Sequence, residues 1–176
     1  MLAEHGAIIV DADAIVRELQ VPGTDVFRRI IDEFGAGVLA PDGTLDREAL
    51  AAIVFRDEDA RARLAGITHP EVYRVIAERI DALKDGGSVV VLDVPLLVES
   101  GGGGGIDHIV VVEADEESRI ARVVAERGLT TEQVRARMAT QASAEQRKAL
   151  ADTIIRNDGS PDDLRAQVDA LWETLR

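Results

Sequence analysis

The chain has 176 residues, 46% of them hydrophobic, which fits one globular domain with a sizeable core. The absence of cysteine excludes disulfides, thiolate zinc sites and thiol catalysis. A formal net charge of −13 argues against binding to nucleic acid or to an anionic membrane, although a few arginines would suffice to hold a small phosphorylated ligand. No apolar run approaches a membrane span and the N-terminus lacks the basic start of a signal peptide, so we expect a cytoplasmic protein.

Short β-branched runs alternate with longer amphipathic segments. The expected strands, all continuous apolar runs typical of parallel strands covered on both faces, are residues 7–10, 88–92, 109–112 and, more weakly, 153–155. A helical block lies between the first two strands, with breaks expected at Pro22-Gly23, at 35–43 and at 68–70, and it ends in a long helix over 71–84. We interpret this block as a helical insertion that covers a substrate.

The second half of the chain is predicted to be mainly helical. After the third strand, helices are expected over 116–127, after the capping box Thr130-x-x-Gln133, and from near Ala144. A final helix has Ser160 as its N-cap and Pro161 at its first position, and it places Trp172 and Leu175 on one apolar face. We find no internal repeat and no domain linker.

The run Gly101 to Gly105 is the one low-complexity segment. Five successive glycines could offer backbone N–H groups to an anion. A phosphate loop, however, needs Lys and then Ser or Thr directly after its glycines, and here Ile106 to His108 follow. We therefore interpret the run as a flexible or rebuilt loop. No Gly-x-x-x-x-Gly-Lys-Ser/Thr sequence occurs anywhere in the chain, and the three scattered histidines have no metal-site spacing, so no protein metal site is expected.

Several segments of the chain, taken in order, form one pattern. They are Val10 to Arg17, Phe34-Gly35, Pro41 to Leu45, Ile67 to Pro70, Val94 to Glu99, Arg137 to Gln141 and Ala151 to Gly159. Together they closely resemble dephospho-coenzyme A kinase over essentially the whole chain. The resemblance implies phosphorylation of the 3′-hydroxyl of dephospho-coenzyme A, the final step of coenzyme A biosynthesis. It also implies ATP with Mg²⁺.

The resemblance implies an α/β fold, a three-layer P-loop kinase with a parallel sheet, a helical substrate-binding insertion and a helical lid. In a single domain over 1–176, the core would be residues 1–20, 85–115 and 151–176. The substrate region would be 21–84 and the lid 116–150.

Family members begin about twenty residues earlier, with a central strand, a loop ending Gly-Lys-Ser-Thr and a helix. We therefore expect the chain as given to lack that first strand and loop and to be impaired in catalysis. Because strand edges would be left unpaired, we also expect marginal stability or self-association. The alternative is a non-catalytic module that binds a coenzyme A-type ligand or a partner.

The resemblance assigns roles to two aspartates that follow the first expected strand. Asp13 matches the family's general base, which accepts the proton of the ribose hydroxyl as phosphoryl transfer proceeds. The alternative for Asp13 is an N-cap for a helix that begins at Ala14. Asp11 is expected on the substrate side, as a hydrogen-bonding partner or a contributor to the magnesium environment. His69 and Pro95 also fall on the substrate side of the pattern, although a packed histidine in a turn explains His69 as well.

Arginines and a turn make up the expected nucleotide side. Arg122 matches the lid arginine that stabilises the transferring charge, with Arg119 and Arg127 as nearby competitors. Arg137 and Gln141, expected one helical turn apart, could face the nucleotide or merely pair on the surface. Lastly, Asn157 and Gly159 resemble the segment that lies against adenine, but a plain turn before Ser160 needs the same residue types.

Overall fold

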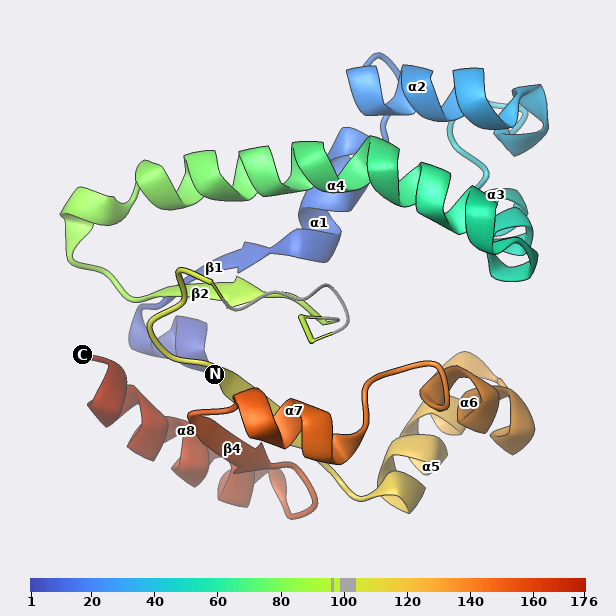
Figure 1. Cartoon of the computed structure of the whole chain (residues 1–176). Coiled ribbons are helices and arrows are strands. Elements are labelled where there is room, and N and C mark those ends of the chain that lie inside the picture. The colour runs from blue at the N-terminus through green and yellow to red at the C-terminus, as the bar shows by residue number, and fades with distance from the viewer. Residues whose placement is uncertain (96, 99–103) are drawn as a thin grey trace. The chain divides into compact units, whose positions relative to one another are not determined.

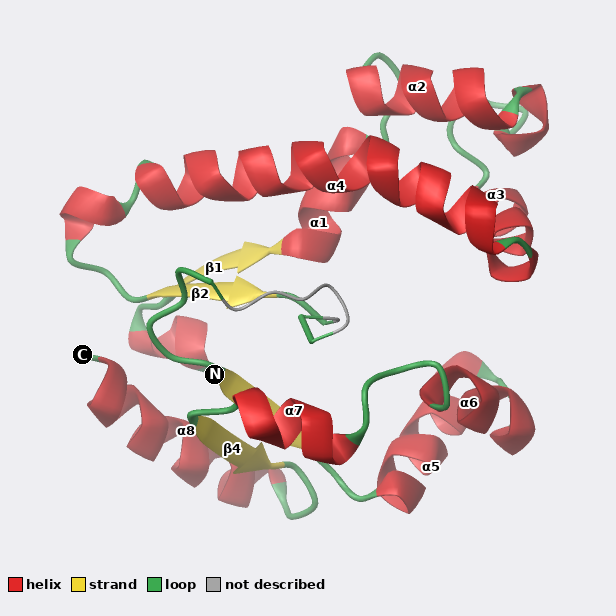
Figure 2. Cartoon of the chain, viewed as in Figure 1, coloured by secondary structure: helices red, strands yellow, loops and turns green. Residues whose placement is uncertain are grey.

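The computed structural model describes residues 1–95, 97–98 and 104–176. The chain divides into two compact units, which we call unit 1 (residues 1–7 and 95–176) and unit 2 (residues 8–94). Each unit is a mixed α/β body with one small parallel sheet (Figure 2). The interpretation of the glycine run falls mostly outside the described residues, as do Leu96 and Glu99, while the division into core, substrate region and lid stays a prediction.

The sheet of unit 2 pairs β1 (Ile8–Asp11) with β2 (Val90–Asp93) in parallel. Ile8 lies opposite Val90, and Asp11 lies opposite Asp93. Both strands were predicted, and their observed ends lie slightly further along the chain. The register brings an aspartate from each strand to the same carboxyl edge, as parallel pairing requires.

Helices make up the rest of unit 2 (Figure 1). They are α1 (Ala12–Leu19), α2 (Asp25–Phe34), α3 (Arg47–Arg56) and α4 (Glu58–Asp81), with short 3₁₀ segments η2 (Ala36–Val38) and η3 (Lys84–Gly86). Two apolar clusters hold them together. The first, which includes Ile30, lies between α2, α3 and α4, and the second, which includes Ile15, lies between α1, α4 and the sheet. Both isoleucines are fully buried. Helix α4 contributes Ile67 to the first cluster and Val72 and Ile76 to the second.

The long helix α4 corrects the prediction of a break at residues 68–70 and of a helix confined to 71–84. It starts after Asp57, whose carboxylate accepts a hydrogen bond from Ala60 N at 3.1 Å, and continues through Pro70. Proline normally ends a helix because it lacks an N–H and its ring crowds the preceding turn. Here Ile67 before the proline and Val72 after it are both buried in the core. Packing on both sides therefore keeps the helix continuous.

Replacing Pro70 by alanine should raise the free energy of unfolding, by up to about 3 kcal/mol, because alanine restores a backbone donor inside the helix. The ring of Pro70 is exposed, so little packing is lost. Urea unfolding followed by circular dichroism measures the change. A lower stability in the alanine variant would show that contacts of the proline ring outweigh the missing hydrogen bond.

In unit 1, β3 (Val110–Glu113) pairs in parallel with β4 (Thr153–Arg156). The helices are α5 (Glu116–Arg127), α6 (Thr131–Met138), α7 (Ala144–Leu150) and α8 (Pro161–Leu175). The bounds predicted for the first of these, the capping box that opens at Thr130, and Ser160 as the N-cap with Pro161 as the first residue of α8 are confirmed. Ile155 of β4 packs with Val168 and Leu171 of α8 to form the core of this unit.

The N-terminal 3₁₀ segment η1 (Leu2–His5) docks on α8. The His5 ring stacks on Trp172 with ring centroids 5.5 Å apart, and its Nε2 lies 2.7 Å from Asp169 Oδ1. Arg165 Nη1 donates to Glu4 Oε2 at 2.6 Å, and this guanidinium holds the pKa of the Glu4 carboxyl below its usual value. None of the described helices has the length and apolar character needed to cross a bilayer.

Candidate active site

Asp11 closes β1 and caps α1. Its Oδ1 accepts a hydrogen bond from Ala14 N at 2.8 Å, and its Oδ2 lies 3.6 Å from Arg17 Nη2. The helix therefore begins at Ala12, directly after the strand. A carboxylate that satisfies a free backbone donor in the first turn has a structural role whether or not it also meets a ligand.

Asp13 lies in the first turn of α1, with its side chain exposed. Its interpretation as an N-cap is wrong, because the helix already starts at Ala12 and Asp11 is the cap. Within the part of the chain that the structure describes, no hydrogen bond or ion pair engages the Asp13 carboxylate. This carboxylate, two residues beyond the carboxyl end of a parallel strand, is therefore free to contact a ligand.

Asp93 is a candidate that the sequence reasoning missed. It ends β2 directly opposite Asp11 and is exposed. The signal was available, since Asp93 follows an apolar strand just as Asp11 does.

The described residues contain no group of three His, Cys, Asp or Glu side chains placed to hold a metal ion. Mg²⁺ needs no such group, because it commonly takes one or two carboxylates and completes its shell with water and substrate phosphates. Asp11 and Asp93, neighbours in register, offer the oxygen donors that such an ion prefers.

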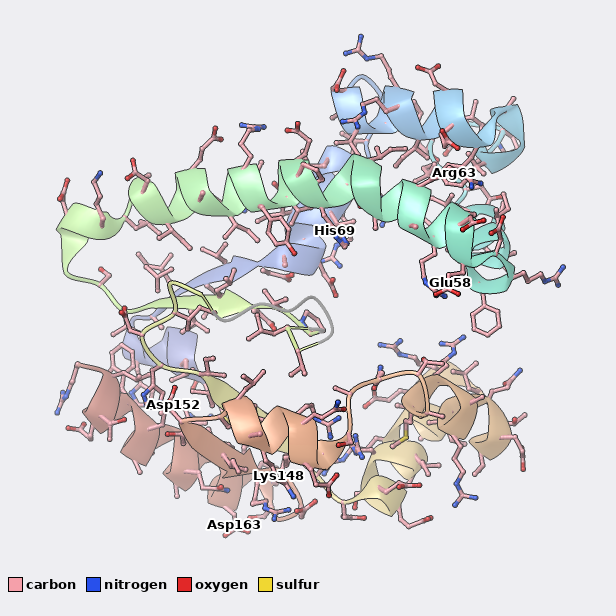
Figure 3. All side chains as sticks on the ribbon, in the orientation of Figure 1. Glu58, Arg63, His69, Lys148, Asp152 and Asp163 are labelled. Carbon is pink, nitrogen blue, oxygen red and sulfur yellow. The ribbon has the colours of Figure 1, made fainter. Side chains whose placement is uncertain are left out.

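His69 lies on α4 with its side chain exposed (Figure 3). Its ring meets that of Tyr73, one turn further along, edge to face with centroids 6.0 Å apart. The interpretation as a packed histidine in a turn is therefore wrong, because the backbone is helical here and the ring is not enclosed. The exposed imidazole, on a helix that packs against α1, remains available to a ligand.

Two of the predicted nucleotide-side residues meet in unit 1. Arg122 Nη2 on α5 donates to the carbonyl oxygen of Asn157 at 2.7 Å. Asn157 N in turn donates to Glu113 O at 2.8 Å, and Asp158 Oδ1 accepts from Asp115 N at 2.6 Å. The loop that follows β4 is thus fixed to the start of α5, which explains how residues far apart in sequence reach one place.

Gly159 has a packing reason of its own. A Cβ atom there would lie 2.8 Å from Asp163 Oδ2 (Asp163 is labelled in Figure 3). That oxygen is engaged by Ser160, whose Oγ lies 2.7 Å away and whose backbone N lies 2.9 Å away. The Ser160 hydroxyl and N–H hold the pKa of the Asp163 carboxyl below its usual value. A side chain at position 159 would therefore displace the Asp163 carboxylate from Ser160, which favours glycine here, and contact with adenine stays a prediction.

Gly159→Ala should lower the melting temperature of the protein by a few degrees, because the added methyl group displaces the Asp163 carboxylate from the N-cap. Thermal unfolding measures the shift. Asp163→Ala is the matched variant, and adding Gly159→Ala to it should produce little further loss, since the carboxylate is already gone. Additive losses would contradict the proposed clash.

The remaining predicted site residues are Arg137, Gln141 and Pro95. Arg137 is exposed on α6, which ends at Met138. Gln141 lies in the turn beyond, so the expectation that these two residues share a helix is wrong. Pro95 opens the second segment of unit 1 and is exposed.

The structure describes the predicted site residues in two groups. Unit 2 contains Asp11, Asp13 and His69, and unit 1 contains Pro95, Arg122, Arg137, Asn157 and Gly159. Within unit 2, β1 and α1 position the two aspartates. Within unit 1, Arg122 and Asn157 are in direct contact. An available carboxylate at the end of a parallel strand and arginines that could contact phosphate are side chains of the types that an α/β phosphotransferase uses.

Residues 1–163 match the family model of dephospho-CoA kinase. A dephospho-CoA kinase of Thermobifida fusca is 48% identical over 175 residues, which cover 99% of this chain and 87% of the relative. The solved structure of TT1252 from Thermus thermophilus is 32% identical with a TM-score of 0.82, covering 99% of this chain and 88% of that one. For the dephospho-CoA kinase from Campylobacter jejuni the identity is 26% and the TM-score 0.72, covering 98% and 87%.

The chain therefore belongs to the dephospho-CoA kinase family, a family of phosphotransferases.

Proposed function

We propose that this chain, when combined with a phosphate-binding loop, transfers a phosphate group from ATP to the 3′-hydroxyl of dephospho-coenzyme A, the final step of coenzyme A biosynthesis. The observation that carries the proposal is the state of Asp13. Its carboxylate is exposed and unengaged by the described residues, two residues beyond the carboxyl end of β1. A general base needs this freedom, because it must reach the proton that it accepts.

The proposed mechanism assigns one task to each group of residues. Asp13 accepts the proton of the attacking hydroxyl as the loose transition state forms. Arg122, held by the Asn157 carbonyl, offers its remaining N–H groups to the charge on the transferring phosphate. Asp11 and Asp93 would hold Mg²⁺, which neutralises charge on the phosphate oxygens when bound. Asn157 and Gly159 would lie against adenine, while His69 and Pro95 would contact the acceptor and Arg137 the phosphates.

The finer architecture belongs to the same proposal. The two small sheets would be parts of a three-layer P-loop kinase sheet, with 21–84 as the substrate region and 116–150 as the lid. The core would be 1–20, 85–115 and 151–176.

The 176 residues contain no Gly-x-x-x-x-Gly-Lys-Ser/Thr sequence, so a polypeptide of these residues alone has no such loop to bind the nucleotide's phosphates. We propose that it binds the acceptor without transferring phosphate.

Weak binding of dephospho-coenzyme A should be measurable with this polypeptide, because Asp13 and the helical region 21–84 are present in unit 2. Isothermal titration calorimetry at millimolar ligand is the test, with adenosine monophosphate as the control for the adenine group alone. Heat from dephospho-coenzyme A that exceeds that of the control is the expected result. No heat from a sample shown to be folded by circular dichroism would contradict the acceptor site.

A further inference from the structure

Strand β4 pairs with β3 along one side only, so its other side forms an outer edge of the small sheet of unit 1. Just beyond the strand, Asn157 N donates across to Glu113 O of β3 at 2.8 Å. The backbone groups of successive strand residues point to opposite sides, so those of Ile154 and Arg156 face the outer edge. Unpaired groups in a row along an edge are a template on which another chain can pair.

A side chain of α8 occupies part of this edge. Arg156 N donates to Gln167 Oε1 at 2.8 Å, and Gln167 Nε2 donates to Arg156 O at 2.8 Å. One carboxamide therefore satisfies both outward backbone groups of Arg156. A residue of an antiparallel neighbouring strand exchanges the same two hydrogen bonds with its partner. The Gln167 side chain thus takes the place of a neighbouring strand at this position.

The carboxamide of Gln167 is held in place by its own helix. Helix α8 packs against β4, where Val168 and Leu171 contact Ile155 (Figure 1). Gln167 directly precedes the buried Val168 and is itself half-buried. Its Nε2 also donates to the Asp163 carbonyl oxygen, one turn earlier, at 3.2 Å. These contacts orient the amide toward the edge of β4.

The sequence of β4 suits the strand to pairing with a second copy of itself. Three of its four residues, Thr153-Ile154-Ile155-Arg156, are β-branched, and the Ile154 side chain is 40% exposed. Antiparallel pairing about a two-fold axis at Ile155 would set Ile154 of each copy opposite Arg156 of the other. Each of these pairs would exchange two hydrogen bonds, and every bond needs a backbone group of Arg156. While Gln167 holds those groups, none of the bonds can form.

We propose that Gln167 closes the outer edge of β4 and thereby prevents a second copy of this chain from pairing its own β4 there. The carboxamide acts as a guard on an edge that would otherwise favour association. The inference depends on contacts within unit 1 alone and is independent of the proposed kinase activity.

Hydrogen exchange of single backbone amides tests whether Gln167 closes the edge. At low concentration of the 176-residue protein, where copies stay apart, Gln167→Leu should speed exchange of the Arg156 amide about 10-fold or more. The Asn157 amide, bonded to Glu113 O, should keep its rate. Leucine is a good helix former, so α8 is retained, and Gln167→Ala replaces it should the leucine variant fail to fold. Unchanged exchange at Arg156 overturns the proposal.

Sedimentation velocity over a range of protein concentrations tests the exclusion of a second copy. About 0.5 M sodium chloride screens the repulsion between copies, each with a net charge of −13. Gln167→Leu should associate about 10-fold more tightly or more than the unchanged chain, because the backbone groups of Arg156 are then open to pairing. Association no stronger than that of the unchanged chain overturns the proposal.

Two further variants show whether association runs through the edge of β4. Adding Ile154→Lys to Gln167→Leu should return association to the level of the unchanged chain, because an exposed lysine on an edge strand opposes pairing. Gln167→Glu is the matched control. It keeps an acceptor for Arg156 N and adds a charge at the edge, so it should associate no more than the unchanged chain. Association that persists with Ile154→Lys, or that appears equally with Gln167→Glu, contradicts pairing through β4.

Discussion

A chain extended ahead of Leu2 with a family-type strand, a loop ending Gly-Lys-Ser/Thr and a helix should phosphorylate dephospho-coenzyme A with ATP, whereas the 176 residues alone should show no measurable transfer. Phosphoryl transfer depends on positioning and charge stabilisation, and that loop supplies backbone donors, a lysine and a magnesium-binding hydroxyl together. Losing a single such donor commonly costs about 100- to 1000-fold in kcat. Formation of coenzyme A, followed by mass spectrometry, is the measurement.

Within the extended chain, Asp13→Asn should lower kcat about 100-fold or more, because asparagine keeps the size of the side chain but cannot accept the proton. Asp25→Asn is the matched control. Asp25 is also an exposed carboxylate in the first turn of a helix of unit 2, paired there with Arg28. Equal turnover with Asn at position 13 would contradict the role of Asp13. Normal turnover by the 176 residues alone would contradict the role of the loop.

Glu113→Gln should reduce the free energy of unfolding by about 3 to 5 kcal/mol, because it leaves Arg147 as a buried charge without its partner. The Glu113 side chain is 5% exposed and that of Arg147 is 20% exposed, with 2.9 Å between Nε and Oε1. The pair ties α7 to the end of β3. Urea unfolding followed by circular dichroism measures the loss.

Two further variants decide whether burial is the cause. Glu173→Gln breaks the exposed pair with Arg176 and should have no measurable effect. Combining Glu113→Gln with Arg147→Met should recover much of the lost stability, since the uncompensated charge is then removed. A loss no larger than that of the exposed pair would show that Arg147 finds other partners when Glu113 is neutral.

Some local signals were interpreted correctly from the sequence, whereas contacts between distant residues were not predicted. The capping box at Thr130 and the N-cap at Ser160 depend on residues that are close in sequence, so the sequence alone contains their signals. The course of α4 through Pro70 does not follow from local propensity, which favours a break. It depends on apolar contacts that Ile67 and Val72 make with distant segments.

The candidate site likewise combines features that local sequence indicates with contacts between distant residues that it does not indicate. The aspartates after the first strand and the family pattern pointed to Asp13, although only the backbone shows that Asp11 caps the helix. The contact of Arg122 with Asn157 joins residues 35 positions apart, and that of Glu113 with Arg147 joins residues 34 apart. No periodicity reports such pairs. Self-association through unpaired strand edges stays a prediction.

The two units contain different fluorescent side chains. The chain has one tryptophan and one tyrosine. Trp172 lies on α8 of unit 1, stacked on His5, while Tyr73 lies on α4 of unit 2 beside His69. Tryptophan emission therefore reports on unit 1 and the docking of the N-terminal segment, and tyrosine emission reports on unit 2. The melting of the two units can be followed separately in unmodified protein, and a ligand that stabilises only one of them can be assigned to its unit.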